Sequence, residues 1–168
     1  MIEWQYFPKS DSIPNHLLDI VKIFSKHETY IESKYKKLAS DEVLSVIRND
    51  ISAAGFKVEK SKLSADKIKV PVLFGRNGKL EKYFDADAYN NDTRTVIEVE
   101  AGRAFTNNQF LKDLFQACVM QDADYLVIAV RKLYLGNPDF DKIVTFMDSL
   151  YASSRLKLPL KGLLIVGY

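Results

Sequence analysis

Four carboxylates stand in the middle of this sequence, each separated by one residue from another. They belong to Asp85, Asp87, Glu98 and Glu100. Apolar residues alternate with them over 83–89 and 95–101, and this period of two is typical of strands with one buried face. The run 90–93 between the two segments consists of turn formers. We therefore expect a hairpin that carries all four carboxylates on one side.

Carboxylates in this arrangement suit the hydrolysis of a phosphodiester. A divalent cation neutralises charge on the phosphoryl oxygens and lowers the pKa of an attacking water, and Mg²⁺ prefers carboxylate oxygens. We expect Asp87 and Glu98 to bind one Mg²⁺ or Mn²⁺, with Glu100 beside the water that attacks. By symmetry about the turn, Asp85 is expected nearly opposite Glu98, where it can replace or assist Asp87. The alternative is a solvated hairpin face, but carboxylates opposite one another across strands repel unless a cation compensates.

The residues before the hairpin are expected to form two helices and two short strands. Apolar residues recur at spacings of three, four and seven over 14–38, which predicts one long helix. Ser40 is expected to cap a second helix, which Gly55 ends. The segments 56–60 and 70–74 favour strands, and the connection between them is rich in lysine.

After the hairpin, helices alternate with buried strands. A helix is expected through about residue 121 with Thr106 as its cap, and another with Asn137 as its cap and Pro138 at its first position. The first of these helices is expected to bury Phe110, Leu111, Leu114, Phe115, Cys118 and Val119. The segments 125–130 and 162–167 are apolar throughout, which is typical of strands buried on both faces. The sequence thus predicts an α/β fold, a mixed β-sheet flanked by helices in the order α-β-β-β-α-β-α-β.

Length and composition limit what such a site can belong to. With 168 residues, of which 47% are hydrophobic, we expect a single domain over 1–168, with 1–39 as an N-terminal helical extension. The first residues lack the charged start and apolar run of a signal peptide, and no apolar stretch approaches the roughly 20 residues that span a bilayer. We therefore expect a cytoplasmic protein with no membrane partner. The formal net charge of +2 decides nothing about nucleic acid.

The order of elements and the paired acids resemble the restriction-endonuclease-like nucleases, which carry the PD-(D/E)XK motif. Asp87 matches the Asp of that motif, Glu98 matches its Glu or Asp, and Glu100 stands where most members have Lys. Type II restriction enzymes similar to BamHI and BglII carry Glu or Gln there, and the run 97–103 looks most like theirs. The resemblance covers about 40–130. It implies a restriction-endonuclease-like fold that cleaves DNA with Mg²⁺, as a homodimer where both strands are cut.

Other polar side chains are candidates for contact with DNA. Arg103 follows the Glu-x-Glu segment and can bind a phosphate through its guanidinium group. Asn107 and Asn108, at a predicted helix start, can hydrogen-bond phosphates or base edges, or simply cap the helix. Lys60 and Lys62 begin the lysine-rich connection and can lie along a phosphate backbone, although such lysines also occur in loops that only face solvent.

Glu42 is a further candidate metal ligand, because a helix acid approaches the metal in some relatives. Its alternative role is to compensate the helix dipole in the first turn. Three functions follow from the sequence. The first is a divalent-metal-dependent endonuclease. The second is a catalytically inactive fold that acts as a nucleic-acid or protein interaction module, since position 100 is not Lys. The third is a nuclease-like subunit that depends on a partner.

Overall fold

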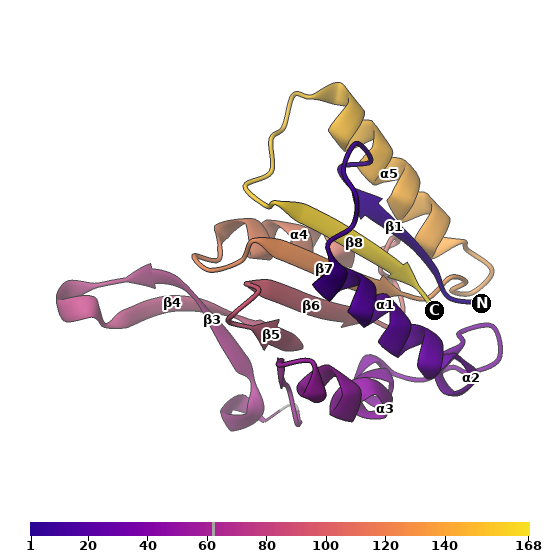
Figure 1. Ribbon diagram of the computed structural model, residues 1–168, viewed down its shortest axis with the longest axis horizontal. Coiled ribbons are helices and arrows are strands. Elements are labelled where there is room, and N and C mark those ends of the chain that lie inside the picture. Colours follow the sequence, from indigo (N-terminus) through magenta and orange to yellow (C-terminus); the bar gives the residue numbers. More distant parts are fainter. Residues whose placement is uncertain (62) are drawn as a thin grey trace.

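The fold is built on a six-stranded mixed β-sheet (Figure 1). The computed structural model describes residues 1–61 and 63–168. In spatial order the strands are β1 (Glu3–Phe7), β8 (Gly162–Gly167), β7 (Tyr125–Val130), β6 (Thr95–Glu100), β5 (Ala88–Asn90) and β2 (Lys57–Val58). β6, β7 and β8 run parallel to one another. β1 and β5 pair antiparallel with β8 and β6, and β2 pairs antiparallel with β5.

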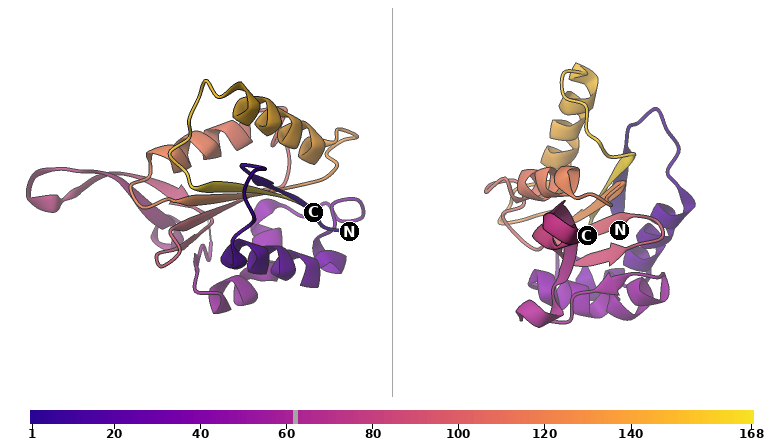
Figure 2. Two further views of the ribbon diagram at one scale, coloured as in Figure 1. Left: turned by 45° about the horizontal axis from the view of Figure 1, so that its top comes forward. Right: turned by 90° about the vertical axis from the view of Figure 1, so that its left-hand side faces the viewer.

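Helices cover both faces of this sheet (Figure 2). One face carries α1 (Asn15–Lys26), α2 (Glu28–Ile31) and α3 (Ser40–Ala53), and the other carries α4 (Gln109–Val119) and α5 (Asp139–Ser153). Each face has its own apolar core, because the central strands bury alternate residues on opposite sides. In β7, Val127 packs on the side of α1 and α3, while Ile128 packs on the side of α4 and α5. The predicted α/β class, with a mixed sheet flanked by helices, is confirmed.

A two-stranded ribbon projects away from the sheet (Figure 1). It consists of β3 (Ile68–Phe74) and β4 (Leu80–Ala86), joined by a 3₁₀ turn at Arg76–Gly78, and another 3₁₀ turn, Ser64–Asp66, precedes it. Gln121 holds the base of the ribbon. Its backbone N–H donates to the carbonyl of Pro71 at 2.9 Å, and its side-chain amide donates to the carbonyl of Val72 at 3.0 Å. The ribbon continues into β5 through one residue, Asp87.

The three strands predicted to share a sheet do so. The segments 95–101, 125–130 and 162–167 correspond to β6, β7 and β8, in adjacent positions. The helices predicted to begin at Ser40 and near 106 are present as α3 and α4, on opposite faces of the sheet. Their predicted caps are wrong, because Ala39 and Asn108, and not Ser40 and Thr106, precede the first helical residues. In the same way, Pro138 and not Asn137 precedes α5. Within the part of the chain that the structure describes, no helix is both long and apolar enough to cross a bilayer.

The N-terminal region differs from the prediction. The single helix over 14–38 is wrong: α1 ends at Lys26, α2 adds one turn, and residues 32–39 are not helical. Here the hydroxyl of Ser33 donates to the carbonyl of Tyr168 and ties the chain to the end of β8. Residues 1–39 also contribute a strand, β1. Tyr6 and Phe7 are buried on opposite faces of the sheet, so no alternation of apolar and polar residues marked this strand.

Candidate active site

Asp87 lies at the junction between the ribbon and the main sheet. The strand predicted over 83–89 is broken there, because β4 ends at Ala86 and β5 begins at Ala88. β4 pairs with β3, whereas β5 pairs with β6. The chain therefore bends at Asp87 to pass from one sheet to the other. A residue at such a bend can direct its side chain along the sheet edge instead of following the strict alternation of a strand.

The register of β5 and β6 brings Asp87 next to Glu98. Ala88 is paired with Ile97, so Asp87, which precedes Ala88, adjoins Glu98, which follows Ile97. Oδ2 of Asp87 accepts a hydrogen bond of 2.7 Å from the backbone N–H of Val99. The predicted position of Asp85 opposite Glu98 is wrong, because the turn is centred one residue later than its sequence symmetry suggested. Asp85 is exposed, and its backbone lies opposite that of Lys69 in the register of β3 and β4.

Glu98 and Glu100 share the face of β6 that α4 covers. The neighbouring residues Ile97 and Val99 belong to the opposite core, as the alternation predicted. From α4, the buried carboxyl group of Asp113 lies within hydrogen-bonding reach of Glu100. Three carboxyl groups from β6 and α4 thus lie together between the strand and the helix.

A cleft with a volume of about 380 Å³ opens over these groups. We call it the acidic cleft. The carboxylates that line it are Glu59, Asp85, Asp87, Glu98 and Glu100, and the polar side chains Lys67, Lys112, Gln116 and Ser40 complete its polar lining. All four carboxylates predicted to gather on the hairpin therefore reach one cavity, although Asp85 does so from the ribbon and not from the sheet.

The electrostatics of the acidic cleft disfavour negative charge. Burial raises the pKa of Asp87 to about 6, against the lowering effect of the Val99 hydrogen bond, and Glu59 and Asp113 raise it further. Burial and the adjacent Asp87 raise the pKa of Glu98 well above its usual value. Burial and Asp113 raise the pKa of Glu100 to about 8. Without a compensating cation, these groups therefore hold protons at pH values where ordinary carboxyls do not.

Two lysines offset part of this charge. Nζ of Lys112 lies 3.2 Å from Oδ1 of Asp113, and Nζ of Lys67 lies 2.8 Å from each carboxylate oxygen of Glu59. Burial would lower the pKa of each lysine, but the nearby carboxylates raise both above the ordinary value. Glu59 is buried, so its ion pair with Lys67 is largely shielded from solvent. Lys112 is half exposed, so its ammonium stays accessible from the cleft.

Sequence reasoning missed Glu59, Lys112 and Asp113. A signal for Asp113 was present, because it stands three residues after Phe110 and four before Ala117, on the apolar stripe of α4. A carboxylate at a position that the helical period places inside requires a partner. The apolar stripe predicted to be buried on this helix was also too wide. Phe115 and Val119, both expected to be buried, are 58% and 50% exposed.

Four of the other predicted site residues do not line the acidic cleft: Glu42, Arg103, Asn107 and Asn108. Glu42 is exposed and outside the cleft lining, and its Oε2 accepts a hydrogen bond of 2.6 Å from the backbone N–H of Ala39. Arg103, Asn107 and Asn108 are exposed in the loop before α4. Asn108 has positive φ and precedes the first helical residue, without a side-chain cap.

The lysines of the connection before β3 are only partly placed. Lys60 is exposed and lines two shallow cavities beside the acidic cleft, together with Arg48, whose guanidinium donates to the Lys60 carbonyl at 3.3 Å. Lys62 lies outside the described residues.

The carboxylates line the cleft but do not converge on one position. Among residues 1–61 and 63–168, no three His, Cys, Asp or Glu side chains are placed to hold a metal ion together. The feature that defines the site is thus the pair of Asp87 and Glu98. Comparisons with protein-family models, curated proteins and solved structures find no significant match.

Proposed function

We propose that this protein hydrolyses phosphodiester bonds in DNA with the help of a divalent cation, Mg²⁺ or Mn²⁺. The observation that carries this proposal is the meeting of Asp87 and Glu98 where the ribbon joins the sheet. Carboxylates held together in a buried setting repel one another, and a divalent cation removes that repulsion. Burial raises the pKa of both groups in the absence of a cation, and a bound cation would lower both.

The oxygen ligands in the cleft fit a hard cation. Mg²⁺ is usually bound through one or two carboxylates, with water and substrate phosphate oxygens in the remaining positions. Asp87 and Glu98 would hold it. Oδ2 of Asp113 is buried and accepts no hydrogen bond from the described residues. When bound, the cation would neutralise charge on the phosphoryl oxygens and lower the pKa of the attacking water.

Glu100 and Lys112 suit the remaining roles in hydrolysis. In its ionised form, a carboxylate whose pKa is about 8 is a stronger base than an ordinary carboxylate, so ionised Glu100 would take the proton of the attacking water. Glu100 cannot also supply the positive charge that Lys supplies at this position in the nuclease family it resembles. The Lys112 ammonium, next to Asp113 on the same side of the sheet, would stabilise the charge that develops on the phosphate.

The order of elements supports a place for this chain among the restriction-endonuclease-like nucleases. α3 precedes the strands that carry the acids, and α4 follows them against the opposite face. β7 and β8 then extend the sheet in parallel from β6. The acids lie near the carboxyl end of β6, at the edge where the ribbon leaves.

Incubation of supercoiled plasmid with the purified protein tests this proposal. We expect nicked or linear DNA in Mg²⁺ or Mn²⁺ and none in EDTA. Glu98→Gln should abolish cleavage, whereas Glu42→Gln, a matched change at an exposed glutamate outside the cleft, should retain it. Cleavage by Glu98→Gln at the wild-type rate would refute the assignment.

A second candidate function is an interaction module that has lost catalysis. The observation in its favour is the closeness of Glu100 and Asp113, because one shared proton relieves the repulsion between them without a metal. Wild-type protein that binds DNA but cleaves neither DNA nor RNA in Mg²⁺, and a Glu100→Lys variant that is equally inactive, would favour this module over the nuclease.

A further inference from the structure

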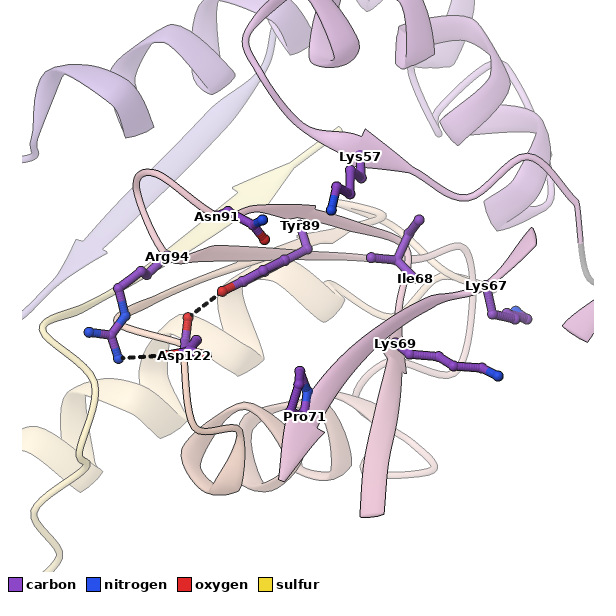
Figure 3. Close-up of a pocket in the computed structure, with 9 residues that line it drawn as sticks. All are labelled: Lys57, Lys67, Ile68, Lys69, Pro71, Tyr89, Asn91, Arg94 and Asp122. Carbon is purple, nitrogen blue, oxygen red and sulfur yellow. Dashed lines mark hydrogen bonds and ion pairs between the residues drawn. The ribbon is translucent and has the colours of Figure 1, made fainter. Parts of the chain in front are cut away.

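A second cavity, of about 480 Å³, adjoins the acidic cleft (Figure 3). It lies between the base of β3 and the end of β5. The polar residues that define it are Lys57, Lys67, Lys69, Tyr89, Asn91 and Arg94. We call it the basic pocket. Its lining includes four cationic side chains and a single carboxylate, that of Asp122. The pocket is therefore suited to an anion.

Two of the four cations are already paired. Arg94 lies 3.5 Å from Oδ1 of Asp122 and 3.6 Å from Oδ2 of Asp124, and Lys67 is paired with Glu59. The backbone of Lys57 pairs with that of Tyr89, but its exposed ammonium has no hydrogen-bond or ion-pair partner among the described residues. Figure 3 shows it reaching from β2 toward the strand that carries Tyr89.

Lys69 is the second cation without a carboxylate partner among the described residues. It is exposed, and its ammonium lies 4.7 Å from the centre of the Tyr83 ring, which orients the side chain but does not neutralise its charge. Figure 3 shows Lys67 and Lys69 extending in the same direction from the base of β3. Lys57 and Lys69 therefore carry the charge that remains for a ligand.

The basic pocket does not offer a surface on which a base could stack. Tyr89 is only 6% exposed, and its hydroxyl donates a hydrogen bond of 2.7 Å to the carbonyl of Asp122. Pro71 and Ile68 are the main apolar residues of the lining. A ligand would therefore be held through charge and not through aromatic contact, as phosphates are.

Shared residues connect the basic pocket with its neighbours. Lys67 lines both the basic pocket and the acidic cleft. Lys57 and Lys67 also line a third cavity, which adds Arg48 and Lys60. A row of adjoining cationic cavities fits an extended polyanion better than one small anion, because successive phosphates can each meet a cation.

We propose that the basic pocket binds the phosphate backbone of the nucleic-acid strand whose scissile bond lies in the acidic cleft. This inference rests on the proposed function and names the path of its substrate. Lys57 and Lys69 contact phosphates, Lys67 marks the passage between the two cavities, and binding here does not depend on base sequence.

Fluorescence anisotropy of a labelled oligonucleotide tests this path. Titrations in EDTA, where no cleavage occurs, are run at several salt concentrations with wild type and with a Lys57→Gln, Lys69→Gln double variant. We expect weaker binding to every sequence, and a salt dependence whose slope falls by about 1 for each lost lysine. The control, Lys22→Gln with Lys36→Gln, removes the same charge from exposed positions elsewhere and should leave the slope unchanged.

Two further measurements separate the outcomes. Equal slopes for wild type and the double variant, both folded by circular dichroism, would overturn the proposal. Tight binding of inorganic pyrophosphate that the double variant loses, without a change in oligonucleotide affinity, would identify a small-anion site and also overturn it. If oligonucleotide binding depends on Lys57 and Lys69 but Mg²⁺ supports no cleavage, hydrolysis is refuted while the basic pocket stands.

Discussion

Glu100 on β6 and Asp113 on α4 face one another within hydrogen-bonding distance, on the side of the sheet where Asp87 and Glu98 also meet. Asp113 raises the pKa of Glu100, whereas burial raises the pKa of Asp113 and the hydrogen bond with Glu100 lowers it. The nearest opposing charge is that of Lys112. Stability and pH are therefore linked at this site, and a bound cation would change both.

The metal-free protein is expected to lose stability as pH rises from about 4 to 8. The pKa values of Asp87 and Glu100 are 3.8 and 4.5 in ordinary surroundings and about 6 and 8 in the fold. Between these limits the folded state binds more protons than the unfolded state, so stability falls with increasing pH. Thermal unfolding in EDTA should give a lower Tm at pH 8 than at pH 5. A Tm that rises over this range would contradict the assigned shifts.

Asp113→Asn is expected to stabilise the metal-free protein at pH 8. The amide keeps the shape of the side chain and can donate a hydrogen bond to Glu100, while it removes one buried negative charge. A gain of 2–4 °C in Tm would correspond to about 1 kcal/mol in a chain of this size. Asp92→Asn, at an exposed position in the turn between β5 and β6, is the control. A lower Tm for Asp113→Asn than for wild type would show that its ion pair with Lys112 outweighs the repulsion.

Asp87→Asn should reduce cleavage by about 100-fold or more, whereas Asp85→Asn should retain most activity. Only Asp87 is fixed beside Glu98, through the Val99 hydrogen bond. Initial rates of plasmid nicking in Mg²⁺ measure the difference. The reverse result, with activity lost only in the Asp85 variant, would place the metal ligand on the ribbon.

Glu100→Gln distinguishes a base from a ligand at that position. If Glu100 accepts the proton of the attacking water, the variant should bind metal as wild type does but lose rate at every metal concentration. The wild-type rate should also fall as pH drops below the pKa of this carboxyl. Partial rescue by higher Mg²⁺ would instead identify Glu100 as a ligand.

Gly162→Ala is expected to destabilise the fold by about 1–3 kcal/mol. A Cβ at this position would lie 2.6 Å from Cε2 of the buried Tyr6 ring, where β1 meets β8. Urea denaturation measures the loss. Gly75→Ala is the control, since its Cβ would meet only the flexible end of exposed Glu81. An unchanged midpoint for Gly162→Ala would mean that β1 is not packed as described.

The sequence by itself determined the central strands and the face on which Glu98 and Glu100 lie. Both follow from local physics, because the alternation along β6 and the apolar runs of β7 and β8 reflect burial on one or both faces. It also indicated α3 and α4. It did not reveal β1, whose adjacent buried residues belong to two different cores.

Only the tertiary structure decided which residues share the site. The bend at Asp87 and the register of β5 arise because one chain segment must pair with β3 on one side and with β6 on the other. That register, and not the spacing of the acids, separates Asp87 from Asp85. Lys112 and Glu59 join the cleft, and Asp113 comes within reach of Glu100, through the packing of α4 and the pairing of β2. These contacts join distant segments, so no local pattern encodes them.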